Sequence, residues 1–146
     1  MTLTINQKLI LDDRLTDSTY PLADMPLHGY DDNILLLSKN ALFPWFILVP
    51  STQETEFHKL STDQQSQTQQ HINTIARFIE MHFSPDKINI ATIGNIVSQM
   101  HIHIIGRRKD DSCWPNVVWG SKQYKDYEAG EVTTIKNQLS EILKPL

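Results

Sequence analysis

The chain has 146 residues, 40% of them hydrophobic and 21% charged, with a formal net charge of -4. These values indicate one folded domain over 1–146 and are far from those of a disordered or membrane protein. The acidic balance disfavours nucleic acids and anionic membranes as partners. A single cysteine, Cys113, excludes an intrachain disulfide. Since residues 1–13 also lack the apolar core of a secretory signal, we expect a cytoplasmic protein.

Two apolar runs in the N-terminal third predict strands. Ile34–Leu37 and Phe46–Val49 show no polar alternation, which indicates that both faces of each strand are covered. Turn-forming residues at 38–40 and Pro44 lie between them and predict a hairpin or a short loop. Pro50 ends the second run.

The segment 61–83 predicts the main helix. Ser61 is suited to cap it, and Gln64 completes a capping box. Pro85 follows directly after the expected end. An apolar stripe of helical spacing marks one face: Ile72, Ile75, Ala76, Phe78 and Ile79.

Two more strands and a second helix follow. The segments 87–93 and 99–105 predict strands joined by a turn at Gly94-Asn95. Apolar residues at helical spacing between Tyr127 and Leu143 predict a C-terminal helix. The elements together predict an α+β fold: an antiparallel sheet of about five strands, with the main helix on one face and the C-terminal helix alongside.

The strand predicted at 99–105 carries the candidate chemistry. Side chains alternate along a strand, so Gln99, His101 and His103 face one way and the apolar even-numbered residues face the other. If the apolar set packs under the main helix, two imidazoles lie together on a polar face. The same alternation puts Asn89 of the preceding strand beside them, where its amide can bind a sugar or a phosphate.

The His-x-His pattern alone also fits other interpretations. Any half-exposed strand can carry two histidines with no function. Two imidazoles at alternate positions can also bind zinc or iron together with one carboxylate. The nearest carboxylates, Asp110 and Asp111, follow only after the expected end of the strand.

The string from Gly94 to Arg107 resembles the signature of the histidine triad (HIT) superfamily. In that signature, three histidines alternate with apolar residues after a turn that begins with glycine. His101 and His103 match the second and third histidines. Gln99 stands where the first histidine is usual, so the sequence departs from the family pattern at this position.

The resemblance extends over most of the chain. A strand ending in proline and then a helix precede the motif, as in the family, so the HIT-like core covers about 30–108 and residues 109–146 form a C-terminal tail. Pro44-Trp45 and the segment 114–120 are similar to a bacterial branch described as diadenosine tetraphosphate hydrolase-like. Many members place a further histidine where Trp45 stands.

This resemblance implies a nucleotide hydrolase or transferase. Such an enzyme cleaves at the α-phosphate of dinucleoside polyphosphates or nucleoside phosphoramidates, here through a covalent nucleotidyl-His101 intermediate. His103 is then expected to bind a phosphate oxygen or assist the leaving group, and Gln99 to complete the polar surroundings of the nucleophile. Neither Gln99 nor Trp45 can carry a proton, so a catalytically weak nucleotide-binding protein is the alternative.

The resemblance also suggests how a nucleotide is bound. Backbone amides of the turn 95–98 are expected around the phosphate, Arg107 near it, and Asn40 near the ribose unless it serves only as a turn residue. The candidate substrate-binding residues are Asn40, Asn89, Asn95, Val97, Ser98 and Arg107.

The remaining expectations concern cofactors, partners and side chains outside the motif. The motif requires no cofactor, although a divalent metal bound with the substrate is compatible with it. A nucleotide is the expected partner, and the family commonly forms homodimers. Four other histidines are interpreted as surface or helix residues, and Trp114 and Trp119 as packing the tail onto the sheet or a second subunit. Those histidines are His28, His58, His71 and His82.

Overall fold

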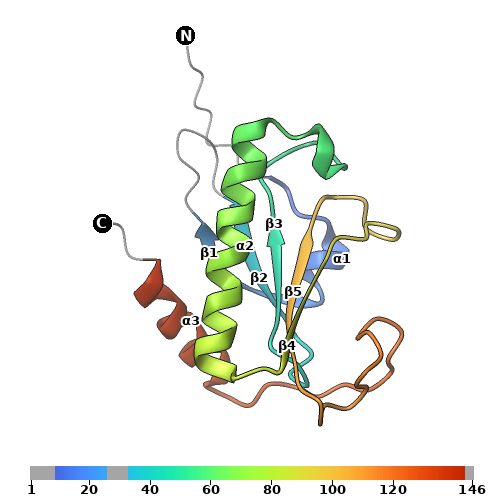
Figure 1. Cartoon of the computed structure of the whole chain (residues 1–146), viewed down its shortest axis with the longest axis vertical. Helices are drawn as coiled ribbons and strands as arrows, with labels where there is room; N and C mark the ends of the chain where they lie inside the picture. Colours follow the sequence, from blue (N-terminus) through green and yellow to red (C-terminus); the bar gives the residue numbers. More distant parts are fainter. Residues whose placement is uncertain (1–8, 26–32, 144–146) are drawn as a thin grey trace.

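A five-stranded antiparallel sheet forms the centre of the computed structural model, which describes residues 9–25 and 33–143 (Figure 1). The spatial order of the strands is β1-β2-β3-β5-β4. Their bounds are β1 Thr19–Met25, β2 Asn33–Ser38, β3 Trp45–Val49, β4 Lys87–Ala91 and β5 Ile102–Arg107. The helices are α1 Asp13–Thr16, α2 Thr62–Phe83 and α3 Glu131–Ile142, with a 3-10 turn at Phe57–Lys59. The predicted α+β fold is confirmed.

Helix α2 covers one face of the sheet and begins as the sequence predicts. The Ser61 hydroxyl accepts a hydrogen bond from the backbone of Gln64, and the Gln64 side chain accepts one from the backbone of Ser61. This capping box satisfies amides that would otherwise be unpaired at the helix start. The helix ends at Phe83, and Ser84 follows in the left-handed conformation. Within the described segments, no helix combines the length and apolarity needed to cross a membrane.

The main core lies between the sheet and the two longer helices. Ile75, Phe78 and Ile79 of α2 are buried, as are Ile135 and Leu139 of α3, which runs beside β1 (Figure 1). Alternate side chains of the central strands complete this core: Leu35, Leu37, Phe46, Leu48, Ile102 and Ile104. Each such side chain contributes roughly 1.5 to 3 kcal/mol through burial. The face of β5 that carries His103 is thereby turned away from α2.

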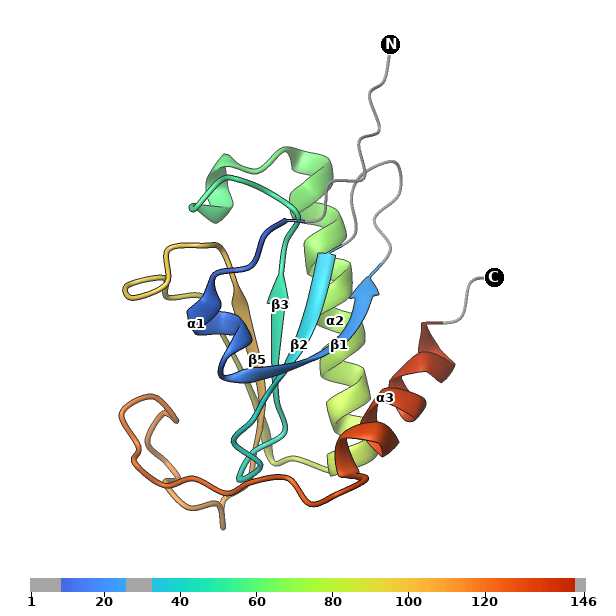
Figure 2. The same ribbon diagram turned by 180° about the vertical axis from the view of Figure 1, so that it is seen from behind.

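The opposite face of the sheet is covered by segments from both ends of the described chain. Leu15 of α1 packs on Leu36 and Ile47, while Val118 packs on Ile105. Figure 2 shows α1 and the segment that carries Val118 on the side away from α2. This arrangement explains why β2 and β3 are apolar on both faces.

Gly106 allows a close approach between β5, α2 and the loop before β3. Its amide donates to the Pro44 carbonyl at 2.9 Å. A β-carbon at this position would lie 2.7 Å from Cγ of Pro44 and 2.8 Å from Cγ2 of Ile79. Any side chain here would therefore push the helix or the loop away from the strand that carries His103.

The structure differs from the predicted elements around the motif. Strand β5 begins at Ile102 instead of Gln99, and β4 ends at Ala91 instead of residue 93. The Gln99 side chain accepts from the amide of Asp12 at 2.9 Å and donates to the carbonyl of Ile10 at 3.3 Å. Gln99 therefore binds the N-terminal segment instead of extending the β4–β5 pairing. Strand β1 was not predicted.

Candidate active site

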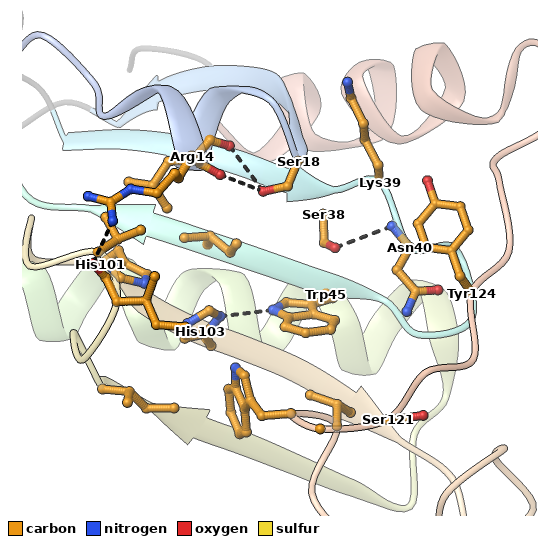
Figure 3. A pocket seen from close by; sticks show the side chains of 18 of the residues that line it. Arg14, Ser18, Ser38, Lys39, Asn40, Trp45, His101, His103, Ser121 and Tyr124 are labelled. Atoms are coloured by element: carbon orange, nitrogen blue, oxygen red, sulfur yellow. Dashed lines mark hydrogen bonds between the residues drawn. The ribbon is translucent and has the colours of Figure 1, made fainter.

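A cavity of about 970 Å³ opens on the sheet face opposite α2 (Figure 3). Trp45 and His103 belong to its floor, and His101 lies at the start of β5 beside the loop 93–97. The walls come from four separate parts of the chain: residues 14–18, residues 38–40, the loop 93–97 and the segment 118–124. The sheet therefore fixes His103 and the backbone of residue 101 next to it, while α1 and three irregular segments shape the space above them.

The backbone of Gln99 determines the tautomer of His101, which lines this cavity. Its Nδ1 lies 2.7 Å from the backbone carbonyl oxygen of Gln99, and because a carbonyl can only accept, Nδ1 carries the proton. In this tautomer the lone pair of the imidazole is on Nε2. Among the described residues, no fully buried side-chain nitrogen or oxygen lacks a partner, so Nε2 is accessible even though His101 is only 7% exposed.

His103 has the opposite tautomer. The indole Nε1 of Trp45 lies 2.9 Å from Nδ1 of His103, and since an indole can only donate, Nδ1 accepts and the proton is on Nε2. Burial, and then the neighbouring His101, lower the pKa of His103 to about 4. The two ring centroids are 5.0 Å apart. The site therefore places a nitrogen lone pair beside a neutral N–H donor.

Aromatic rings form the side of the cavity next to His103. The Trp119 ring meets the His103 ring edge-on, with centroids 5.0 Å apart. It also meets the Trp45 ring edge-on, with centroids 6.0 Å apart. The Phe43 ring meets the Trp45 ring edge-on, with centroids 6.5 Å apart. These rings keep water away from one side of the imidazole while leaving the cavity side open.

Positive charge predominates among the side chains that line the cavity. Arg14, Lys39 and Lys122 line it, against one carboxylate, Asp17. Arg14 also pairs with Asp12 at 2.8 Å. A local excess of positive charge on a chain whose net charge is -4 suits an anionic ligand.

Three of the candidate substrate-binding residues line this cavity: Asn40, Asn95 and Val97. The Asn40 side chain accepts from the amides of Leu42 and Lys125, so it also holds a turn and ties the tail to β2. Ser98 lines a second cavity, of about 420 Å³. His101 lines both cavities. The Gln99 side chain is bound to the N-terminal segment and does not line the main cavity.

Asn89 and Arg107 share the histidine side of the sheet, as expected, but neither lines the cavity. Arg107 is 1% exposed and donates to Asn89 Oδ1 at 3.0 Å and to Asp111 Oδ2 at 2.7 Å. Burial favours the protonated acid at Asp111, but hydrogen bonds from Arg107 and two backbone amides outweigh it and lower the pKa. In the structure, Arg107 joins Asn89 to Asp111, and these contacts hold the tail against the sheet.

Several lining residues lie outside every motif that the sequence offers: Arg14, Lys39, Lys122 and Tyr124. Trp119 was noted, and its segment does pack on the sheet, but its ring also lines the cavity. His71 is a buried helix residue whose Nδ1 lies 2.9 Å from the side-chain nitrogen Nδ2 of Asn33. His28 lies outside the described residues.

The metal-binding interpretation required a carboxylate near the two histidines. Asp110 instead pairs with Arg108 at 2.9 Å and Asp111 with Arg107 at 2.7 Å. Over residues 9–25 and 33–143, no group of three or more histidine, cysteine, aspartate or glutamate side chains is arranged to hold a metal ion.

Comparisons with known proteins agree with this geometry. The HIT domain family matches residues 27–110. A histidine triad protein from Bradyrhizobium japonicum is 35% identical, covers 92% of this chain and 98% of its own, and superposes with a TM-score of 0.84. A histidine triad protein from Sinorhizobium meliloti is 31% identical, with a TM-score of 0.82, and the alignment covers 90% of this chain and 95% of that protein. One from Marinobacter aquaeolei is 30% identical, with a TM-score of 0.82, and the alignment covers 92% of this chain and 95% of that protein. A comparison with curated proteins finds no match.

Proposed function

Because this chain belongs to the HIT domain family, we propose that it is a nucleotide hydrolase or transferase that cleaves at the α-phosphate of a dinucleoside polyphosphate or a nucleoside phosphoramidate. One observation carries the proposal. Nδ1 of His101 lies 2.7 Å from the carbonyl of Gln99, which leaves Nε2 with a lone pair beside a cavity large enough for a nucleotide. His101 is the nucleophile in this proposal.

In the first step, the Nε2 lone pair of His101 attacks the α-phosphorus. A P–N bond forms, and the bond to the leaving group breaks with its electron pair going to the leaving atom. His101 is then a positively charged nucleotidyl-imidazolium whose Nδ1–H remains bonded to the Gln99 carbonyl. The Nε2–H of His103 donates to the leaving group or to a nonbridging oxygen, where negative charge develops.

In the second step, water attacks the same phosphorus. The P–N bond breaks, its electron pair returns to Nε2 of His101, and a nucleoside monophosphate is released while the proton from water passes to solvent. A transferase uses another hydroxyl or phosphate in place of water. Splitting one displacement into two lowers each barrier.

Other lining residues have binding roles in this proposal. Asn40 is assigned to the ribose, and the backbone of the loop 95–98 to the oxygens of the reacting phosphate. Arg14 and Lys122 are suited to the more distant phosphates of a polyphosphate chain. The protein supplies side chains only, and a divalent ion enters with the polyphosphate when the substrate carries one.

We also propose a homodimer, paired through the free edge of β4. This strand lies at one end of the sheet, and Ile90 within it and Ile93 beyond it are 51% and 46% exposed. Exposed apolar side chains on a free edge favour pairing with a second copy about a two-fold axis. Sedimentation equilibrium of the wild type and of Ile90→Lys tests this, since the variant is expected to be monomeric.

The decisive experiment measures AMP release from diadenosine tetraphosphate and from adenosine 5′-phosphoramidate. His101→Ala is expected to lower kcat by roughly 10³-fold or more on a cleaved substrate. His82→Ala removes an exposed imidazole on α2 and should leave the rate unchanged. Rapid quenching followed by mass spectrometry should find adenylate on the peptide that contains His101. If the wild type binds AMP but cleaves neither substrate, the chain is a nucleotide-binding protein instead.

A further inference from the structure

Trp45 determines which nitrogen of His103 carries the proton. Its indole Nε1 lies 2.9 Å from Nδ1 of His103, and an indole nitrogen has a proton to donate but no lone pair in the ring plane to accept with. Both residues are fixed by the sheet, because Trp45 begins β3 and His103 lies on the neighbouring strand β5. The contact is therefore a built feature of the floor of the cavity.

The surroundings of His103 also keep the ring neutral. An imidazolium would have to carry a proton on Nδ1, directly against the indole N–H of Trp45. The groups around the ring are His101 and Trp119, with Ile47 and Ala91 opposite on the adjacent strands. Among these described neighbours only His101 titrates, and no carboxylate is present to stabilise a positive charge. Burial first and His101 second lower the pKa of His103 to about 4.

Building on the proposed function, we propose that Trp45 is a positioning residue that holds His103 as a neutral Nε2–H donor and so makes the site prefer phosphate leaving groups over amine leaving groups. The substrate class it selects is then the phosphoanhydride, as in a dinucleoside polyphosphate. Phosphoramidates are cleaved poorly.

The preference follows from where the electron pair goes when the bond to phosphorus breaks. In an anhydride, the P–O pair goes to the oxygen of a departing phosphate, which is stable as an anion and needs only a hydrogen bond from His103. In a phosphoramidate, the P–N pair goes to nitrogen, and an amine leaves only after it has gained a proton. A neutral imidazole is too weak an acid to supply that proton, and the Gln99 amide is bound to Asp12 and Ile10.

The test combines a spectroscopic readout with a ratio of rates. Nitrogen-15 NMR of the imidazoles reports the tautomer and the titration of His103 in the wild type, in Trp45→Phe and in the matched control Trp119→Phe. Trp119→Phe removes a second indole next to the same ring, one that makes no hydrogen bond to His103 in the structure. Competition between diadenosine tetraphosphate and adenosine 5′-phosphoramidate gives the ratio of their kcat/KM values.

We expect the wild type to carry the His103 proton on Nε2 at neutral pH and to favour the anhydride by at least about 100-fold, the usual value of an effective general acid. Trp45→Phe should give a mixture of tautomers, a higher pKa for His103, and a shift of the ratio toward the phosphoramidate of roughly 10-fold at mildly acidic pH. Trp119→Phe should leave the His103 proton on Nε2, because the hydrogen bond from Trp45 is intact in this variant.

Three results count against the inference, each against a different part of it. A proton on Nδ1 of His103, or a charged ring at neutral pH, contradicts the role of Trp45 whatever the activity. Equal cleavage of both substrates, still dependent on His101, contradicts the leaving-group preference and leaves the proposed function standing. Failure of the wild type on both substrates, with His103 in the expected tautomer, counts against the proposed function and the preference alike but not against the contact with Trp45.

Discussion

Arg107 Nε and Asp111 Oδ2 lie 2.7 Å apart, in an ion pair whose side chains are 2% and 7% exposed. A second hydrogen bond joins Arg107 Nη2 to Asp111 Oδ1 at 3.1 Å, and the guanidinium lies over the rings of Phe43 and Trp114. The pair fastens the beginning of the C-terminal tail to the last strand before it. Because the tail later returns to the cavity as Trp119, this contact supports the site without touching it.

We therefore expect Arg107→Met to lower the free energy of unfolding by about 3 to 5 kcal/mol, since it leaves a buried carboxylate unpaired. Urea denaturation measures the change. Arg108→Met is the matched control, because its pair with Asp110 is exposed on both sides and should contribute at most about 1 kcal/mol. Equal effects of the two substitutions would show that the buried pair has no special role in stability.

Gly106→Ala should destabilise the fold by about 1 to 3 kcal/mol, because the added methyl overlaps Pro44 and Ile79. Thermal or urea unfolding measures this cost. A double-mutant cycle with Ile79→Ala separates overlap from other causes: removing the Ile79 methyl should recover part of the loss, so the two changes should not be additive. Strict additivity would mean that helix α2 is not what Gly106 accommodates.

Acid should weaken the fold through His103. Its pKa is about 4 in the folded protein, below the ordinary value of 6.5, so the unfolded chain binds a proton first as the pH falls. The stability that His103 contributes is present above pH 6.5 and is lost progressively down to pH 4, by up to about 3 kcal/mol. In measured unfolding free energies, the wild type should lose up to about 3 kcal/mol relative to His103→Asn between pH 6.5 and 4. Parallel curves would contradict the depressed pKa.

Gln99→Ala should loosen the N-terminal segment while leaving the nucleophile in place. The side chain of Gln99 holds the amide of Asp12 and the carbonyl of Ile10, whereas the hydrogen bond from the His101 ring goes to the backbone carbonyl of Gln99. Hydrogen exchange at the Asp12 amide should become faster by about 10-fold or less, as expected when one hydrogen bond is lost. Gln70→Ala on the exposed side of α2 is the control.

The effect of Gln99→Ala on activity distinguishes the two roles considered for Gln99. If AMP release falls as far as in His101→Ala, the side chain takes part in catalysis and its contact with the N-terminal segment is secondary. A loss of less than about 10-fold is the expected result, because a general acid or base would contribute about 10² to 10⁴.

The sequence predicted the helices and strands that are determined by local signals, such as a capping box, a proline or the alternation of apolar and polar residues. Helix α2 begins and ends where its capping box and Pro85 indicate, and alternation along the chain correctly placed His101 and His103 on one side, away from α2. Strand β1 was missed because Pro21 and Ala23 interrupt any strand pattern, and its pairing with β2 shifts register between these two residues. Pairing with β2, not local preference, makes it a strand.

The candidate site was predictable only in part, for the same reason. Alternation gives the direction in which Asn89 and Arg107 point but not which of their neighbours they bind, and Asp111 lies after the end of the strand. Arg14 and Lys122 lie in segments with no periodic pattern, and they reach the cavity through contacts between residues far apart in the chain. The tautomers of the two histidines likewise depend on contacts that only the folded chain provides.

The walls of the main cavity include residues as early as Arg14 and as late as Tyr124. During synthesis, the sheet and both imidazoles would already have emerged from the ribosome while one wall was still missing. Binding competence should therefore appear only after the last fifth of the polypeptide has been made and its segment 118–124 has packed onto the sheet.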